Sequence, residues 1–351
     1  MWKFAVKLVL GCIVVLPWQA NAQNQRLSVQ VGVPVPNIVA IQLYVAQQTN
    51  MFRDEGIAVE VRYSTGAPQA TQLVAAGQAD VALATVEPLI SGHEKGIRAK
   101  AFVRLNRQMI YYIAVPEQSP AKRLEDLKGA KIGVVNLGAA SVAVTRSMFR
   151  AANIPTTPDT FVPVGLGEQA LLALRFGNVQ ALGLWSNAYY QMERAGHKFR
   201  YFYHPTLSEF GNVALIASDK GIQERRQELC GFSRAVAKAS LFIVENPEAA
   251  LRMYWVAVPS AKLGADDPEA LRNGMREILP QAQDLNVGFP PRAQFGAFDP
   301  AKFRDYMALL KEHGLANETP PVGDVVTDAF VKCMNEFDSD AVRKLAREWK
   351  K

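Results

Sequence analysis

Short segments of small and polar residues follow several apolar stretches of the chain. The clearest is residues 136–141, Asn-Leu-Gly-Ala-Ala-Ser, which joins a predicted strand to a predicted helix. Small side chains let a ligand approach the backbone, and the free amides and positive dipole end of the helix attract a carboxylate or sulfonate. Alternatively, Gly138 and Ser141 only turn the chain and cap the helix. Residues 64–67, Ser-Thr-Gly-Ala, are a similar segment earlier in the chain.

Two side chains beyond a later apolar strand suit a planar organic ligand. Trp185 stands at the carboxyl end of the predicted strand 179–184, where its ring could stack on a planar solute. The equally good alternative is a buried tryptophan that holds two helices together. Asn187 could form hydrogen bonds with the ligand or merely cap the next helix.

Charged residues near these segments bear on the charge of the ligand. Glu87 follows the predicted strand 81–84, and a carboxylate in a cleft would disfavour an anion unless a cation compensated it. Arg104 is the candidate cation, because a guanidinium can bind an oxyanion through two hydrogen bonds. A surface salt bridge is the alternative role for Arg104. Phe210 precedes another predicted strand and could line the rear of the cleft.

The candidate ligand-binding residues lie mainly in loops at the carboxyl ends of predicted strands. They are Pro36, Asn37, Gly66, Ala67, Thr85, Glu87, Arg104, Asn136, Gly138, Ala139, Ala140, Ser141, Gly167, Trp185, Asn187 and Phe210.

Other kinds of chemistry find little support in the sequence. The four histidines are widely spaced and form no His-Glu-x-x-His pattern, so we expect no metal site. Residues 165–168, Gly-Leu-Gly-Glu, lack the third glycine of a dinucleotide fingerprint, and we expect no NAD or other cofactor. No nucleophile elbow or Walker loop occurs. Lysines and arginines are scattered rather than clustered with aromatics, which argues against nucleic acid as a partner.

A pattern of glycine, strand and helix occurs twice. Residues 77–88 read GQADVALATVEP, and residues 177–188 read GNVQALGLWSNA. Around each copy, apolar strands alternate with helices that end at glycine, which indicates parallel sheets covered by helices on both faces. The sequence therefore predicts an α/β protein with two similar lobes. In open sheets of this kind, ligands bind beyond the carboxyl ends of the strands, where the candidate residues lie.

The expected organisation has four parts. Residues 1–22 are a signal peptide, 23–115 the first part of lobe 1, 116–214 lobe 2, and 215–351 a return to lobe 1 with C-terminal helices. We expect the chain to cross between the lobes near Val115 and again near Val213–Ser218, as a two-strand hinge. The helical tail is expected to pack on lobe 1.

The N-terminus indicates export to the periplasm. Lys3 and Lys7 precede an apolar run from Leu8 to Leu16, and Ala20-Asn21-Ala22 suits signal peptidase. Lipidation at Cys12 is a less favoured alternative. The mature chain keeps two cysteines, Cys230 and Cys333, enough for one disulfide whose existence the sequence leaves open.

Three stretches in order resemble a known family. They are residues 44–57, with Tyr-Val-Ala and Asn-Met-Phe-Arg-Asp-Glu-Gly-Ile, residues 73–81, Leu-Val-Ala-Ala-Gly-Gln-Ala-Asp-Val, and residues 124–134, Leu-Glu-Asp-Leu-Lys-Gly-Ala-Lys-Ile-Gly-Val. Together they are similar to the signatures of periplasmic substrate-binding proteins of ABC importers, in the nitrate, sulfonate and taurine branch. The resemblance covers roughly residues 27–260.

The resemblance implies a type II periplasmic-binding-protein fold and a function in transport. Two lobes would close over one small-molecule solute, and the closed monomer would deliver the solute to an ABC permease. With Trp185 and Phe210 nearby, we expect a small organic anion, a sulfonate or carboxylate that could be aromatic.

Two alternatives use the same fold. Thiamine-pyrimidine synthases share the architecture and are enzymes with an iron centre, but they carry a cysteine-rich motif that this sequence lacks. A periplasmic sensor or scavenger would keep the cleft and dock on a receptor instead of a permease. We expect a protein without enzymatic activity.

Overall fold

The computed structural model describes residues 25–203, 210–264, 266–285, 295–312 and 314–350. The predicted signal peptide, 1–22, lies outside these residues. Within the described part, no helix combines the length and apolar character needed to cross a membrane.

The first lobe is built on a five-stranded sheet in the order β2-β1-β3-β10-β4. Its strands are β1 (Gln25–Val31), β2 (Ile57–Tyr63), β3 (Val81–Thr85), β4 (Ala99–Arg104) and β10 (Val213–Ser218). β1 pairs in parallel with β2 and β3, whereas β10 is antiparallel to β3 and β4. All five residues of β3 are buried, as expected for a central strand covered on both faces.

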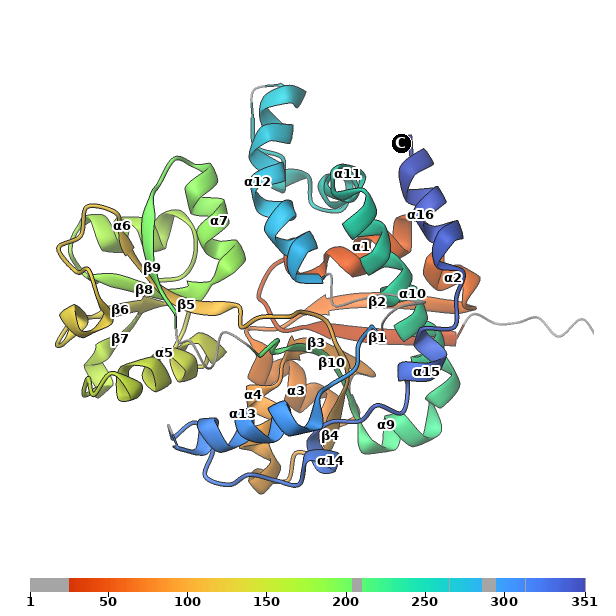
Figure 1. Ribbon diagram of the computed structural model, residues 1–351, viewed down its shortest axis with the longest axis horizontal. Coiled ribbons are helices and arrows are strands. Elements are labelled where there is room, and N and C mark those ends of the chain that lie inside the picture. The colour runs from red at the N-terminus through yellow and green to blue at the C-terminus, as the bar shows by residue number, and fades with distance from the viewer. Residues whose placement is uncertain (1–24, 204–209, 265, 286–294, 313, 351) are drawn as a thin grey trace, which may run out of the picture.

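The second lobe repeats this plan in the order β7-β6-β8-β5-β9. Its strands are β5 (Tyr111–Pro116), β6 (Ile132–Val134), β7 (Phe161–Pro163), β8 (Ala181–Trp185) and β9 (Phe199–Phe202). β6 is parallel to β7 and β8, and β5 is antiparallel to its neighbours. The two copies of the sequence pattern thus become equivalent strands, β3 and β8, each third in its sheet. The predicted two-lobe α/β fold is confirmed (Figure 1).

Helices connect the strands in both lobes. In the first lobe they are the 3-10 turn Ile38–Ala40, α1 (Ile41–Gln48), α2 (Met51–Asp54), α3 (Ala67–Ala75) and α4 (Glu87–Gly92); in the second they are α5 (Ala140–Ala151), α6 (Glu168–Arg175) and α7 (Ser186–Arg194). α3, α6 and α7 are each followed by a positive-φ glycine, Gly77, Gly177 and Gly196, a conformation that stops a helix at little cost.

The crossings between the lobes differ from the predicted ones. Val115 lies within β5, which pairs with β8 in the second sheet, so the first crossing is residues 105–110. The return crossing lies between β9 and β10, and its residues 204–209 are not described. β9 was not predicted, because three of its four residues are only partly buried and show no apolar run.

The C-terminal part is helical, as predicted. Its helices are α9 (Asp219–Glu224), α10 (Arg226–Glu245), α11 (Pro247–Ala257), α12 (Asp267–Leu285), α13 (Pro300–Glu312), α14 (Val322–Val325), α15 (Val331–Met334) and α16 (Ser339–Glu348). α14 is short, because Val326 leaves the helix to bridge Ala101 beside β4. A disulfide between Cys230 and Cys333 joins α10 to α15, with a Cα–Cα distance of 6.0 Å.

Most of the tail covers the first lobe, with α10 packed against α1 and α2. One helix departs from the prediction that the tail packs on lobe 1 alone. α12 lies between the lobes and packs against α11 on one side and α7 of the second lobe on the other (Figure 1).

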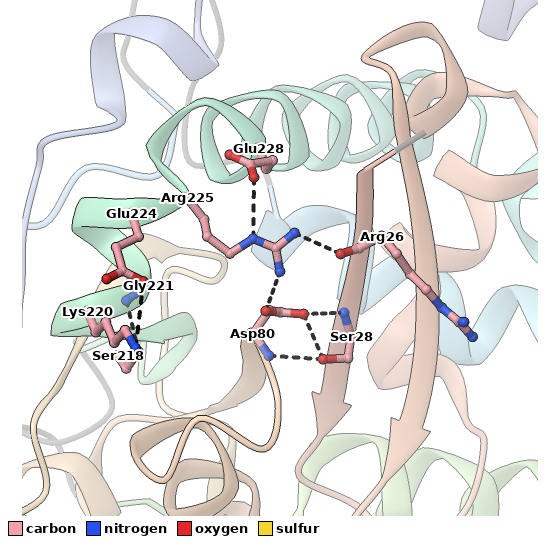
Figure 2. Close-up of polar contacts among 9 residues, drawn as sticks. All are labelled: Arg26, Ser28, Asp80, Ser218, Lys220, Gly221, Glu224, Arg225 and Glu228. Atoms are coloured by element: carbon pink, nitrogen blue, oxygen red, sulfur yellow. Dashed lines mark hydrogen bonds and ion pairs between the residues drawn. The ribbon is translucent and has the colours of Figure 1, made fainter. Parts of the chain in front are cut away.

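Asp80, in the second of the family-like stretches, is a structural anchor at the amino end of β3. Its Oδ2 accepts hydrogen bonds from the backbone amide and hydroxyl of Ser28, both at 2.7 Å, and its Oδ1 pairs with Arg225 (Figure 2). Arg225 also donates to the carbonyl oxygen of Arg26 at 2.8 Å. Asp80 therefore joins β1, β3 and the start of α10, at the end of the sheet opposite the candidate site.

We expect Asp80→Asn to lower the free energy of unfolding by about 1–2 kcal/mol, because hydrogen bonds to a charged group are lost and Arg225 keeps only its ion pair with Glu228, at 3.4 Å. Urea unfolding would measure this. The control is Glu224→Gln, which removes only the exposed pair with Lys220 at 3.8 Å and should change stability by less than about 0.5 kcal/mol. Equal effects of the two substitutions would contradict the anchoring role.

Asp80 also makes stability depend on pH. Burial tends to raise the pKa of its carboxyl, but the hydrogen bonds from Ser28 and Arg225 outweigh burial and lower it below the usual value. A lowered folded-state pKa gives stability that is present above the unfolded pKa, about 3.9, and is lost as the pH falls through the folded value. Below about pH 4, the unfolding free energy of Asp80→Asn should therefore fall less steeply than that of the wild type.

Candidate functional site

The loops at the carboxyl ends of strands from both lobes meet around one central cavity of about 40 Å³. Seven predicted residues line it, three from the first lobe and four from the second: Gly66, Ala67, Thr85, Asn136, Ala139, Ala140 and Trp185. Across it, Asn136 Nδ2 donates a hydrogen bond to the carbonyl oxygen of Thr65 at 3.2 Å. The lobes are therefore in contact, and the central cavity as it stands is far smaller than the roughly 300–1,000 Å³ of typical ligand pockets.

Two helices begin at this cavity without a side-chain cap. α3 follows Gly66 and α5 follows Ala139, and neither of these residues provides a capping hydrogen bond. Asn136 instead orders the preceding turn, because its Oδ1 accepts from the amide of Gly138 at 2.9 Å. Free amides at two helix N-termini, one from each lobe, make this point attractive for an oxygen acceptor on a ligand.

The hydroxyls of Thr85 and Ser141 are buried and lack partners. Thr85 is 5% exposed and Ser141 1% exposed, and neither oxygen forms a hydrogen bond within normal geometric limits. Thr85 lines the central cavity, whereas Ser141 and Gly138 do not line it. Nearby, burial raises the pKa of Tyr111, with the Glu87 carboxylate adding to the shift and the Thr85 hydroxyl, which approaches Tyr111 but lies outside normal hydrogen-bond geometry, opposing it.

Trp185 forms a wall between the central cavity and a larger one. The second cavity, of about 400 Å³, is lined by the predicted residues Pro36, Asn37 and Gly167 as well as by Trp185. Trp185 is the last residue of β8 and only 8% exposed, yet it lines both spaces. A ring in this position can stack on a planar solute that enters either space.

A third cavity, of about 420 Å³, lies against the first crossing and α12. It is lined by the predicted residue Asn187 and by residues that were not predicted, among them Gln42, Gln281 and Asp284. Gln42 is 2% exposed and its Oε1 has no partner. A glutamine within the otherwise buried apolar face of α1 is the sequence signal that could have found it, whereas nothing local indicates Asp284.

Besides Gly138 and Ser141, three predicted residues line none of these cavities. Arg104 donates through Nε to the carbonyl oxygen of Ala297 at 2.9 Å and through a terminal nitrogen to that of Asn106 at 3.1 Å. Its guanidinium thus binds backbone carbonyls of the tail and of the first crossing, and burial lowers the pKa of Arg104. It does not line any of the three cavities, so it supplies no cation to the cleft.

Glu87 and Phe210 form a buried cluster instead. Glu87 Oε1 accepts from Asn212 Nδ2 at 2.9 Å and from the hydroxyl of Tyr306, while Oε2 is buried without a partner. Phe210 stacks on Tyr306 with ring centroids 5.2 Å apart. The cluster ties α4 and the return crossing to α13. It does not line the three cavities.

The central cavity carries no charged side chain among the described residues that line it. Around it, Arg107 and Asp284 line the third cavity, and Glu168 and Arg194 line the second. In the described part of the chain, no three histidine, cysteine, aspartate or glutamate residues are grouped so that they could hold a metal ion. The arrangement suits reversible binding of a small, largely uncharged or singly charged molecule.

Two similar α/β lobes joined by two crossings, with strand-end loops facing each other, define the periplasmic binding protein fold. The chain belongs to the NMT1/THI5-like family, which it matches over residues 37–250. It is 24% identical over 300 residues to a formylaminopyrimidine-binding protein of Halalkalibacterium halodurans, covering 84% of this chain and 86% of the relative.

Solved structures with the same fold include two binding proteins for anions. One is the periplasmic aliphatic sulphonate binding protein SsuA of Escherichia coli, with a TM-score of 0.63 and 17% identity, covering 85% of this chain and 96% of that one. The other is the periplasmic nitrate-binding protein NrtA of Synechocystis, with a TM-score of 0.63 and 12% identity, covering 94% and 99%. At these identities the likeness concerns the fold.

Thr85→Val tests whether the unpartnered hydroxyl serves a ligand. Replacing a buried hydroxyl without a partner by a methyl group of the same shape should leave the unfolding free energy unchanged or raise it by about 1 kcal/mol. Solute affinity should fall, because a hydrogen bond would be lost. Urea unfolding and calorimetric titration would separate the two effects. A stable variant with undiminished affinity would show that Thr85 has no part in binding.

Proposed function

We propose that this chain is the periplasmic solute-binding component of an ABC importer. The observation that carries the proposal is the meeting of strand-end loops from both lobes around one cavity, with Asn136 and Thr65 in contact across it. A solute held there touches both lobes only when they are closed, so its binding energy favours the closed form. The closed surface is what a permease would recognise. Export by the signal peptide and action as a monomer are parts of the same proposal.

The solute is proposed to be a small organic anion, a sulfonate or carboxylate, with a planar ring. The N-termini of α3 and α5 provide amides and partial positive charge for its oxygens. Trp185 provides an apolar surface for its ring. Similarity in fold to sulphonate- and nitrate-binding proteins supports an anion.

A neutral pyrimidine is the second candidate. The lining of the central cavity has no lysine, arginine or histidine among its described residues, and Arg104 is bound elsewhere. The amides at helix N-termini can also donate to a neutral carbonyl oxygen, and a formyl group carries one. The name of the formylaminopyrimidine-binding relative points the same way.

The enzyme and sensor alternatives receive less support. The relatives and structural neighbours named above are binding proteins rather than enzymes. Cys230 and Cys333 are bonded to each other in the tail, remote from the cavities at the cleft, and provide no ligand for an iron centre there. A receptor-docking sensor would use the same cleft and would differ only in the partner of the closed form.

A thermal-shift screen of the chain from residue 23 tests the proposal with benzoate, benzenesulfonate, taurine, nitrate and formylaminopyrimidine. A ligand at 100 times its dissociation constant adds about 2.7 kcal/mol of stability. We expect the two aromatic anions to raise the melting temperature more than taurine or nitrate. If formylaminopyrimidine alone raised the melting temperature, a neutral pyrimidine rather than an organic anion would be favoured as the solute. No shift with any compound would contradict the proposed function for these solute classes.

Trp185→Leu should abolish most of the ligand-induced shift, because the stacking surface is removed. Trp255→Leu is the matched control, since Trp255 is also buried, at 7% exposure, but lies in α11 and lines none of the three cavities. Both variants should have lower melting temperatures without ligand. If Trp185→Leu kept the full shift, the stacking role would be wrong.

A further inference from the structure

α12 and α7 face each other with matching polar residues. Gln281 and Glu277 lie one helical turn apart on α12, and Asn187, Gln191 and Arg194 lie at successive turns of α7. Asn187 Nδ2 donates to Gln281 Oε1 at 2.6 Å, and Gln191 Nε2 donates to Glu277 Oε1 at 3.1 Å. α12 belongs to the tail on the first lobe, so these hydrogen bonds join the two lobes.

The centre of this contact is a buried ion pair. Arg194 and Glu277 approach to 2.8 Å, and their side chains are 5% and 0% exposed. Burial raises the pKa of Glu277, and the opposing effect of Arg194 does not restore the usual value. The Nε of Arg194 is also buried without a partner. A buried ion pair that is incompletely satisfied adds little net stability, but removal of one partner leaves the other charge uncompensated.

The other contacts of α12 hold it to the first lobe and the crossing. α12 packs on α10 and α11 of the tail. Near its C-terminal end, Asp284 Oδ1 accepts from the backbone amides of Arg107 and Gln108 at 2.9 and 3.0 Å. α12 is therefore fixed to one lobe and to the first crossing, and it contacts the other lobe through the residues described above.

We propose that Glu277 is a positioning residue for solute binding. By holding Arg194 it fixes α7, and with it Trp185 and Asn187 at the start of that helix, in the closed arrangement of the lobes. Glu277 acts on the solute only through α7. The role in affinity rests on the proposed function, whereas the role in closure does not.

The need for the lobes to open explains why α12 carries the charged Glu277 at a buried position where an apolar residue would give equal stability. Opening the lobes would separate Glu277 from Arg194 and return both to water, where each is well solvated. Two apolar surfaces would instead resist separation. A buried ion pair thus gives a defined register when closed without preventing opening.

The test compares Glu277→Gln with the matched variant Glu55→Gln. Glu55 is 10% exposed and bonds Arg234 at 2.9 Å and Lys238 at 2.7 Å, but all three residues lie within the first lobe and its tail. Small-angle scattering without solute would report the radius of gyration, and calorimetric titration with benzenesulfonate and formylaminopyrimidine would report affinity. Arg194→Lys, which keeps the charge, serves as the second variant if Glu277→Gln does not fold.

We expect Glu277→Gln to have a larger radius of gyration than the wild type and roughly tenfold weaker solute binding, equivalent to about 1.4 kcal/mol. Glu55→Gln should lower the melting temperature but leave the radius of gyration and the solute affinity unchanged. The exchanged pair Arg194→Glu with Glu277→Arg should recover part of the compactness. An unchanged radius of gyration in Glu277→Gln would overturn the proposal whether or not solute binds. A wild-type chain that binds neither probe would count against the proposed function and leave the scattering result to decide on Glu277.

Discussion

Each sheet of this protein is completed by a strand that follows a crossing from the other lobe. β5 lies between β8 and β9, and β10 lies between β3 and β4, and both are antiparallel to their neighbours. Because these inserted strands are inside the sheets rather than at the edges, their hydrogen bonds to two neighbours hold the end of each crossing, whereas the crossings start from the edge strands β4 and β9. The lobes are joined through the segments between β4 and β5 and between β9 and β10, and their strand-end loops meet at the central cavity.

This constraint explains what the sequence could and could not predict. Alternating strands and helices, ended by Gly77, Gly177 and Gly196, are local signals, and they predicted both lobes. The position of a crossing is not local. Val115 continues an apolar run whichever sheet it joins, and only its pairing with β8 assigns it to the second lobe. β9 is a partly exposed edge strand without periodicity, so sequence reasoning missed it.

The candidate site also divides into residues that local sequence signals predict and residues whose role depends on contacts distant in the chain. Residues that follow strands, such as Gly66, Thr85, Asn136 and Trp185, come together because the fold places all strand ends on one cleft. Arg104 also lies at a strand end, but its guanidinium donates to the carbonyl oxygen of Ala297 in the tail and to that of Asn106 in the first crossing. The tail residue that binds Arg104 lies almost two hundred positions later in the chain, and no sequence pattern near Arg104 predicts the contact. No local pattern predicts the contacts of Gln281, Asp284 and Glu277 with the second lobe and the first crossing either.

The distribution of charge follows from these contacts. Two buried carboxylates of the described residues near the lobe interface are held by neighbouring groups, Glu87 through one oxygen by the donors Asn212 and Tyr306, and Glu277 by Arg194 and Gln191. The described residues that line the central cavity carry no charge, so the groups offered to a solute there are the amides at helix ends and an aromatic ring. Dipoles of that kind bind an oxygen whether it belongs to an anion or to a carbonyl group, but they stabilise a full negative charge less than a guanidinium would. The preference between an anion and a neutral pyrimidine therefore depends on how close the solute's charge lies to Arg107, which lines the third cavity, since Arg194 beside the second cavity is already paired with Glu277.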